Sequence, residues 1–304
     1  MIENMSTKQK VAAGGIALIT LLVVLLGIFG SAGRNNEYQP QNEFKLDPWI
    51  PLKLGPIDMS INKGVMYVFI AAILATSVMV FVARRMTQRP NNVQTAVEAG
   101  YDFAANQIVG ANIADRKLAR KWFPFIATLF FFILFSNLIG YIPLPTNTEH
   151  AFHVGGIEIP SFAIYAATAN VSVPLVLTLM VVGIYHFEGI RANGPIKYVK
   201  SWVPPGITGF AAFPLFLIEV ISQFVRIISL SVRLFANILA GHLLILFMGG
   251  ALIVILGIAA VGALTLPVAI IFFMFEVVLI AGLQAFIFAT LTSIYLGEAT
   301  AEGH

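Results

Sequence analysis

One stretch of sequence decides the fold of this chain: residues 214–248, PLFLIEVISQFVRIISLSVRLFANILAGHLLILFM. After its first residue the stretch contains no proline, and its only glycine is Gly241, so no residue in it forces a helix to stop. Its 35 residues would make a helix of roughly 52 Å at about 1.5 Å per residue, whereas a bilayer core is about 30 Å thick. The stretch therefore predicts a membrane helix that must break or tilt steeply.

The composition of the whole chain agrees with a membrane location. Of the 304 residues, 58% are hydrophobic and 11% are charged, against about 25% charged in ordinary soluble domains. Apolar stretches long enough to span a bilayer lie at residues 11–30, 65–83, 122–142, 168–187, 211–248 and 262–296. None shows the alternation of a membrane barrel. We therefore predict an all-α polytopic membrane protein with five or six hydrophobic helices, the last two long and strongly tilted.

The N-terminal hydrophobic segment, residues 1–32, has two interpretations. Lys8 and Lys10 precede the apolar run, and Gly30-Ser31-Ala32 follows it. This order is typical of a cleaved signal peptide, but the run is long for one and also fits an extra membrane anchor. Residues 33–304 form the membrane domain under either interpretation.

The basic residues predict the orientation. Seven of them separate the second and third stretches (Arg84, Arg85, Arg89, Arg116, Lys117, Arg120 and Lys121), and three follow the fourth (Arg191, Lys197 and Lys200). The loop at 143–160 contains two glutamates and no Lys or Arg. By the positive-inside rule, the two basic loops are cytoplasmic and the 143–160 loop is exported. Apolar residues at helical spacing between Arg89 and Asp115 predict an amphipathic helix on the cytoplasmic surface.

Ionisable side chains lie inside the last two stretches: Glu219, Arg226, Arg233, His242 and Glu276. An arginine at the centre of a membrane helix costs about 3 kcal/mol on insertion scales, and such residues usually serve ion or proton movement. Glu219, Arg226 and Arg233 are seven residues apart. Each is therefore rotated by only about 20° around the helix axis from the one before, so the three share one face. His242 points to roughly the opposite side from Arg233.

These charged groups need partners. Arg226 can pair with Glu219 on its own helix or reach an interface, whereas Arg233 needs either Glu276 or a carboxylate of another protein. The neighbouring hydroxyls are interpreted as ties between helices; they belong to Ser222, Ser229, Thr290 and Thr292. His186 and Glu188 end a span and are expected in the interface.

Other chemistry finds no support in the sequence. The chain lacks cysteine, a Walker A loop, a GxGxxG run, HExxH and GxSxG. His150 and His153 lack a nearby run of further metal ligands. No cofactor and no metal are predicted.

Three motifs carry a family resemblance. The run SLSVRLFANILAGH at residues 229–242 closely resembles the signature of subunit a of F-type ATP synthases. LQAFIF at residues 283–288 resembles the last helix of that family, and NLIGYIP at residues 137–143 resembles an earlier one. The motifs occur in the family's order, and the resemblance covers about residues 50–297.

The resemblance implies a non-catalytic, proton-translocating stator subunit of the F0 sector. In that family two half-channels meet a rotating c-ring, whose carboxylates are deprotonated beside an essential arginine, here Arg233. Gln284 and Asn237 would lie near it, and the proton path would include Glu219, His242, Glu276 and Asn137. His242 stands where some relatives carry an acid, and Glu276 near where they carry a histidine, so this pair is exchanged.

The resemblance also implies partners and a location. The partners are the c-ring proteolipid subunits, the peripheral stalk b subunits, the F1 ATPase head indirectly, and the lipid bilayer, with no nucleic acid. The location is a bacterial plasma (inner) membrane or, alternatively, a mitochondrial inner membrane. Whether the coupling ion is H⁺ or Na⁺ is not decided by this chain. The alternatives in other classes are an ion-coupled secondary transporter or channel and a purely structural anchor; we find no inverted repeat of the transporter kind.

Overall fold

The computed structural model describes residues 44–301 except 56, 59, 155–156, 204–205, 208 and 252–258, together with Thr20 and Val24. The N-terminal segment of residues 1–32 lies outside the described residues apart from those two positions, so both interpretations of it stay open. The chain divides into two compact units. The larger unit contains residues 46–239 and 277–304, and the smaller unit includes residues 240–276.

The described chain is almost entirely helical. Its first half contains β1 (Lys53–Leu54), β2 (Ile57–Asp58), α2 (Lys63–Arg84), α3 (Asn92–Phe103), the π-helical turn η2 (Ala104–Val109), α4 (Arg116–Gly140), β3 (Leu144–Val154) and β4 (Ile157–Ala163). Its second half contains the 3₁₀ turn η3 (Ala167–Ala169), α5 (Ser172–Asn193), α6 (Pro195–Lys200), the 3₁₀ turn η4 (Gly209–Ala211), α7 (Ala212–Leu246), the π turn η5 (Phe247–Ala251), α9 (Ala259–Phe275), the π turn η6 (Glu276–Ile280) and α10 (Ala281–Thr300).

Among the described residues, five helices are long and apolar enough to cross a membrane: Lys63–Arg84, Arg116–Gly140, Ser172–Asn193, Ala212–Gly250 and Thr265–Thr300. They confirm the all-α polytopic prediction. The break allowed within residues 214–248 is not found, because α7 is one α-helix of 35 residues. A helix of that length, roughly 52 Å, fits a core of about 30 Å only by tilting.

Polar capping residues determine where several helices begin, which hydropathy alone does not predict. The side chains of Asn62 and Asn91 each accept a hydrogen bond from the backbone N–H three residues on, at 3.1 and 2.8 Å, and begin α2 and α3. Asp115 accepts one from the N–H two residues on, at 2.9 Å. This cap starts α4 at Arg116, earlier than the apolar stretch at 122–142 predicts, because capping satisfies otherwise unpaired N–H groups at a helix start.

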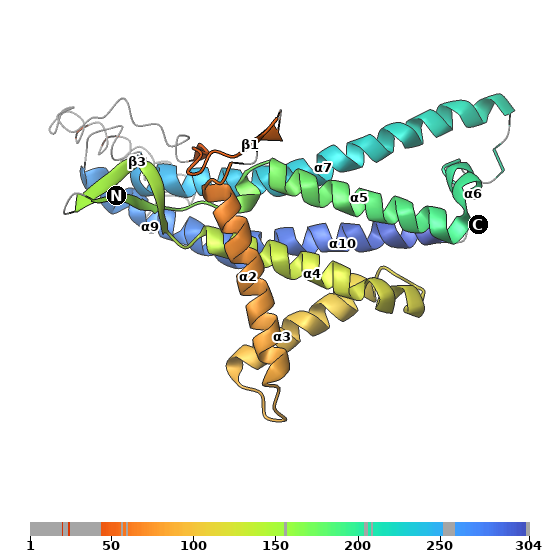
Figure 1. Cartoon of the computed structure of the whole chain (residues 1–304), viewed down its shortest axis with the longest axis horizontal. Helices are drawn as coiled ribbons and strands as arrows, with labels where there is room; N and C mark the ends of the chain where they lie inside the picture. Colours follow the sequence, from red (N-terminus) through yellow and green to blue (C-terminus); the bar gives the residue numbers. More distant parts are fainter. Residues whose placement is uncertain are drawn as a thin grey trace, which may run out of the picture. The chain divides into compact units, whose positions relative to one another are not determined.

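The core of the larger unit forms around α10, which runs alongside α4 and α5 (Figure 1). One face of α10 carries Ala281, Ala285, Ala289 and Ser293 at four-residue intervals, and all four are fully buried. Small side chains at this spacing let helices approach closely in a bilayer, where lipid is as apolar as leucine and packing must supply the attraction. Helix α4 also packs against α2.

A β-hairpin occupies the loop that the sequence analysis assigned only as exported. Strands β3 and β4 are antiparallel, with Leu144 opposite Ala163 and His153 opposite Glu158. The register shifts twice along the hairpin. The sequence analysis predicted no strand here.

The helix predicted between Arg89 and Asp115 is present as α3 and the π turn η2. Ala104 and Ile108 of its predicted apolar face are fully buried. Tyr101 stays half-exposed, and its ring meets that of Phe123 edge-on at 4.8 Å between centroids. The apolar face therefore packs within the protein at its end and is open at its start.

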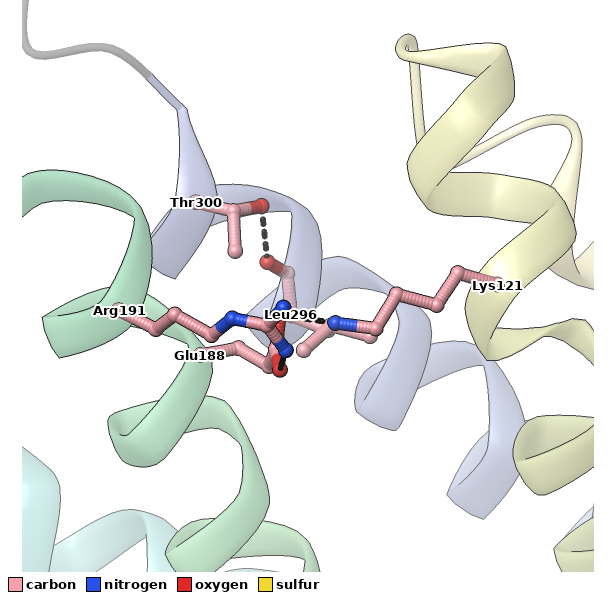
Figure 2. A network of polar contacts seen from close by, with 5 residues as sticks. All are labelled: Lys121, Glu188, Arg191, Leu296 and Thr300. Carbon is pink, nitrogen blue, oxygen red and sulfur yellow. Dashed lines mark hydrogen bonds and ion pairs between the residues drawn. The ribbon is translucent and has the colours of Figure 1, made fainter.

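An ion cluster joins the start of α4 to the end of α5 (Figure 2). Lys121 Nζ lies 2.7 Å from Glu188 Oε2, and Arg191 Nη1 lies 3.3 Å from Glu188 Oε1. The Glu188 side chain is 7% exposed, whereas those of Lys121 and Arg191 are 42% and 63% exposed. Figure 2 shows Leu296 and Thr300 of α10 beside the cluster. The buried member of the cluster is thus the anion.

This asymmetry predicts the order of stability effects. Lys121→Met leaves a buried carboxylate with one exposed cation, and we expect a loss of about 1–3 kcal/mol. Glu188→Gln removes the buried charge while both cations can turn to water, so its loss is smaller, and the double variant resembles Glu188→Gln alone. Thermal unfolding of the purified protein in detergent measures the difference, with the exposed Lys117→Met as control. A larger loss in Glu188→Gln than in Lys121→Met would contradict this account.

Candidate functional site

Glu219, Arg226 and Arg233 form a polar stripe along one face of α7. The stripe begins inside the bundle and ends at its surface. The side chains of Glu219 and Arg226 are half-buried, whereas Arg233 is exposed. Each seven-residue step turns the side chain by about 20° around the helix axis, so Arg233 lies roughly 40° from Glu219. This rotation moves Arg233 toward the open side of the helix. The predicted common face is therefore divided between two environments.

Arg233 is the outermost charge of the stripe. Its Nη2 donates a long hydrogen bond to Ser229 Oγ at 3.4 Å, one turn earlier. Among the described residues of its own unit, no carboxylate lies within 4 Å of the guanidinium. Asn237, one turn further on, is also exposed. The charge of Arg233 is thus uncompensated within this unit, and its predicted pairing with Glu276, which belongs to the other unit, stays a prediction.

The open side of α7 is otherwise apolar. Its exposed large side chains recur at three- and four-residue intervals: Leu217, Ile218, Ile221, Phe224, Val225, Ile228 and Val232. In a bilayer such a face meets lipid or another protein. A guanidinium at its end has no favourable lipid partner.

A second polar group lies in residues 240–276. His242 is 1% exposed and Glu276 is 7% exposed. The Glu276 carboxylate lies directly against Gly241, so that a Cβ built on Gly241 would overlap Glu276 Oε1. Glu276 also begins the π turn η6, a kind of irregularity that is frequent at functional sites. The acid is therefore placed beside the residue that precedes His242; the relay contact between the His242 ring and Glu276 stays a prediction.

Asn137 ties α4 to two other segments. Its Nδ2 donates to the Ala281 carbonyl at 3.2 Å, and its Oδ1 accepts a hydrogen bond from Thr168 Oγ1 at 2.7 Å. Close by, a Cβ on Gly140 would lie 2.8 Å from the Ala166 Cα, so only glycine fits there. Asn137 thus fixes the start of α10. Gln284, one turn further along that helix, is 4% exposed.

Glu219 lies in a polar cluster with residues from another helix. Gln223 Nε2 donates to Glu219 Oε1 at 2.6 Å, and Arg226 Nη2 lies 3.8 Å from the same oxygen. This confirms the predicted pairing of Arg226 with Glu219. Arg226 Nη1 also lies 3.5 Å from Glu298 Oε2 at the end of α10. The sequence analysis missed Glu298 as a site residue, because no local pattern relates it to Arg226.

The described part of the chain contains no candidate metal site. No group of three His, Asp or Glu side chains there could hold a metal ion. The described polar groups of the site are carboxylates, a histidine, amides and arginines.

The fold and these groups define a polytopic helical membrane protein with ionisable side chains at membrane depth. Comparison with known families gives a match to the ATP synthase A chain model over residues 65–297. The chain is 32% identical over 271 residues to ATP synthase subunit a of Hyphomonas neptunium, covering 86% of this chain and 95% of that protein. It is 34% identical over 249 residues to the same subunit of Rubrobacter xylanophilus, covering 81% and 87%.

A third relative, ATP synthase subunit a of Beijerinckia indica, is 30% identical over 273 residues, covering 88% of this chain and 98% of that protein. The chain belongs to the ATP synthase A chain family. It is therefore a subunit of a membrane-embedded ATP synthase complex.

The contact between Gly241 and Glu276 yields a prediction. In Gly241→Ala the new methyl group must displace the Glu276 carboxylate, and overpacking of this kind costs about 1–3 kcal/mol. Gly249→Ala is the matched control, because a Cβ there meets nothing within 4 Å. We expect a lower midpoint of thermal unfolding and slower proton pumping for Gly241→Ala only. Equal behaviour of the two variants would show that the Glu276 carboxylate does not occupy this position.

Proposed function

We propose that this chain is the proton-translocating stator subunit of an F-type ATP synthase. It provides two half-channels and the arginine, Arg233, that deprotonates the carboxylates of a rotating c-ring. As a member of its family it is a non-catalytic membrane subunit. The observation that carries the proposal is the exposed Arg233 guanidinium at membrane depth, without a carboxylate partner among the described residues of its unit.

The Arg233 guanidinium carries a fixed positive charge. A guanidinium stays protonated, whereas a carboxylate buried in lipid is neutral. At about 4 Å and an effective dielectric constant of about 20, a guanidinium attracts a carboxylate by roughly 4 kcal/mol. This attraction favours the ionised carboxylate by about a thousandfold. A ring carboxylate that reaches Arg233 therefore releases its proton, and the fixed cation also impedes protons from crossing directly.

The remaining residues are assigned to the two half-channels. Glu219 lies on the side of the predicted cytoplasmic loops, and His242 with Glu276 forms the relay of the opposite half-channel. Asn237 and Gln284 lie along the helices that face the ring beside Arg233. Asn137 supports the path by holding the start of α10. The exposed apolar face of α7 is the surface that a ring of helical hairpins would cover.

The partners follow from this role. We propose direct contacts with the c-ring proteolipids and the peripheral stalk b subunits, and an indirect connection to the F1 head. The chain is a multi-pass membrane protein of an ATP synthase complex, and we propose the bacterial plasma membrane as its location. The relatives named above are bacterial proteins.

The decisive experiment replaces Arg233. Arg233→Gln keeps hydrogen-bonding capacity but removes the charge, so a ring carboxylate has no reason to release its proton. We expect an assembled complex that has lost ATP-driven proton pumping and proton-driven ATP synthesis, whereas Arg226→Gln keeps measurable activity. The assay is proton pumping in inverted vesicles, with assembly checked by subunit content.

The alternatives give different outcomes in the same assay. Substantial coupled pumping by an assembled Arg233→Gln complex would overturn the proposed mechanism and favour a structural anchor. A secondary transporter would carry a solute and would purify without a ring of small proteolipids or an ATPase head.

The exchanged pair is tested by exchanging it back. If His242 and Glu276 form one relay, His242→Ala and Glu276→Ala each slow proton entry, and His242→Glu combined with Glu276→His recovers part of the rate. The rate of ATP-driven pumping in vesicles is compared on a logarithmic scale. A double exchange that is no faster than the sum of the effects of its two single changes would show that the residues are not coupled.

A further inference from the structure

A polar cavity of about 220 Å³ lies between the end of α5, α6, the first half of α7 and the end of α10. Its ionisable and hydrogen-bonding lining comes from all four elements and includes Tyr185, Tyr198, Glu219, Gln223, Arg226 and Glu298. The volume is large enough for several water molecules, and a cavity with this many polar partners is one that water occupies. It lies on the side of the predicted cytoplasmic loops, because α5 leads there into Arg191 and Lys197.

Arg226 stands between the two carboxylates of the cavity. Its guanidinium reaches Glu219 at 3.8 Å and Glu298 at 3.5 Å, and it lies over the Tyr295 ring, 4.8 Å from the centroid. The Glu219 side chain is 29% exposed and that of Glu298 is 57% exposed. The two acids therefore form an inner and an outer position on either side of one cation.

Hydrogen bonds continue inward from Glu219. Gln223 donates to Glu219 at 2.6 Å and accepts a hydrogen bond from the Tyr185 hydroxyl at 2.6 Å. Burial raises the pKa of Tyr198 above its ordinary value, so this phenol adds no charge to the cavity at neutral pH. The two acids and the arginine together carry one negative charge when both acids are ionised, and none when the pair holds one proton.

We infer that Glu298 is the outermost proton-exchanging group of the path to Glu219, and that Arg226 is the positioning residue that holds both carboxylates at one water-accessible cavity. Glu298 takes a proton from the cytoplasm, passes it through cavity water to the Glu219 carboxylate, and returns to the ionised form; the reverse sequence releases a proton. The guanidinium keeps its own protons throughout. This inference rests on the proposed function.

A purely structural interpretation has to be distinguished. Glu298 could serve only as a counter-ion that fastens α10 to α7 through Arg226. Removing the carboxylate would then disturb Arg226, and the disturbance would vanish once Arg226 is also replaced. A proton-exchanging Glu298 keeps part of its effect when Arg226 is replaced, because cavity water still connects the two carboxylates.

The experiment measures passive proton conduction in inverted vesicles stripped of the ATPase head. We expect Glu298→Gln to lower conduction about tenfold, less than the hundredfold or more that a committed acid–base group contributes, because cavity water carries part of the flow. Glu298→Asp restores at least half of the rate, and Arg226→Gln with Glu298→Gln still conducts several-fold more slowly than Arg226→Gln alone. Asp102→Asn is the control, since this exposed carboxylate lies outside the cavity.

Several results would overturn the inference. They are unchanged conduction in Glu298→Gln, no recovery in Glu298→Asp, or disappearance of the loss in the Arg226→Gln background. If Glu298→Gln does not reach normal subunit content, Glu298→Asn is compared with Glu298→Asp, which has the same shape and differs in its titratable group. Arg233→Gln is assayed for ATP-driven pumping in parallel: coupled pumping by that variant defeats the proposed function, whereas its loss together with unchanged conduction in Glu298→Gln defeats only this inference.

Discussion

A guanidinium keeps its proton at physiological pH, and hydrocarbon solvates it poorly. Helix α7 nevertheless presents Arg233 on its open side, at the end of a row of exposed apolar side chains. The cost of this placement, about 3 kcal/mol on insertion scales, is not offset by any carboxylate among the described residues of the same unit. An anion or water from outside that unit must compensate the charge, and this requirement underlies the function proposed for the chain.

The packing of the larger unit provides a fixed support for such a charge. Small residues bring α10 close to α4 and α5, Asn137 hydrogen-bonds to the first residue of α10, and Lys121 with Glu188 joins α4 to α5. These contacts use the polar and small side chains of the interior, because a hydrophobic driving force between helices is absent in lipid. Among the described residues, the side chains on the open face of α7 are exposed instead. The contacts that hold the helices together therefore lie inside the unit, whereas the face of α7 proposed to meet a partner is apolar.

Much of the fold could be predicted because a bilayer restricts the possible structures. A spanning segment must be a helix of about 20 or more apolar residues, and three of the five spans begin and end within four residues of the predicted stretches. The ends differ where a polar cap extends a helix, as Asp115 does for α4. The β3–β4 hairpin and the π turns were not predicted, because neither leaves a mark in hydropathy averaged over a span.

Within the site, only contacts between residues of the same helix could be predicted. Seven-residue spacing predicted that Glu219 and Arg226 could pair, but Glu298 lies in another helix, and no spacing in the sequence states which helix ends meet. One of the hydroxyls interpreted as ties between helices, that of Thr292, makes a different contact. Thr292 Oγ1 donates to the Phe288 carbonyl of its own helix at 2.9 Å, since a carbonyl four residues back is always within reach of a helical threonine.

The two arginines of α7 show why residue type and depth do not determine a role. Arg226 has two carboxylates within 4 Å and an aromatic ring beneath it. Its charge is therefore cancelled locally, and the cluster presents no net positive charge to a distant anion. Arg233 has a single hydroxyl at 3.4 Å. Of the two arginines, only Arg233 presents an uncancelled positive charge to a carboxylate from outside its unit. We therefore propose that their surroundings, rather than their residue type, separate a positioning residue from one that changes the protonation of a partner.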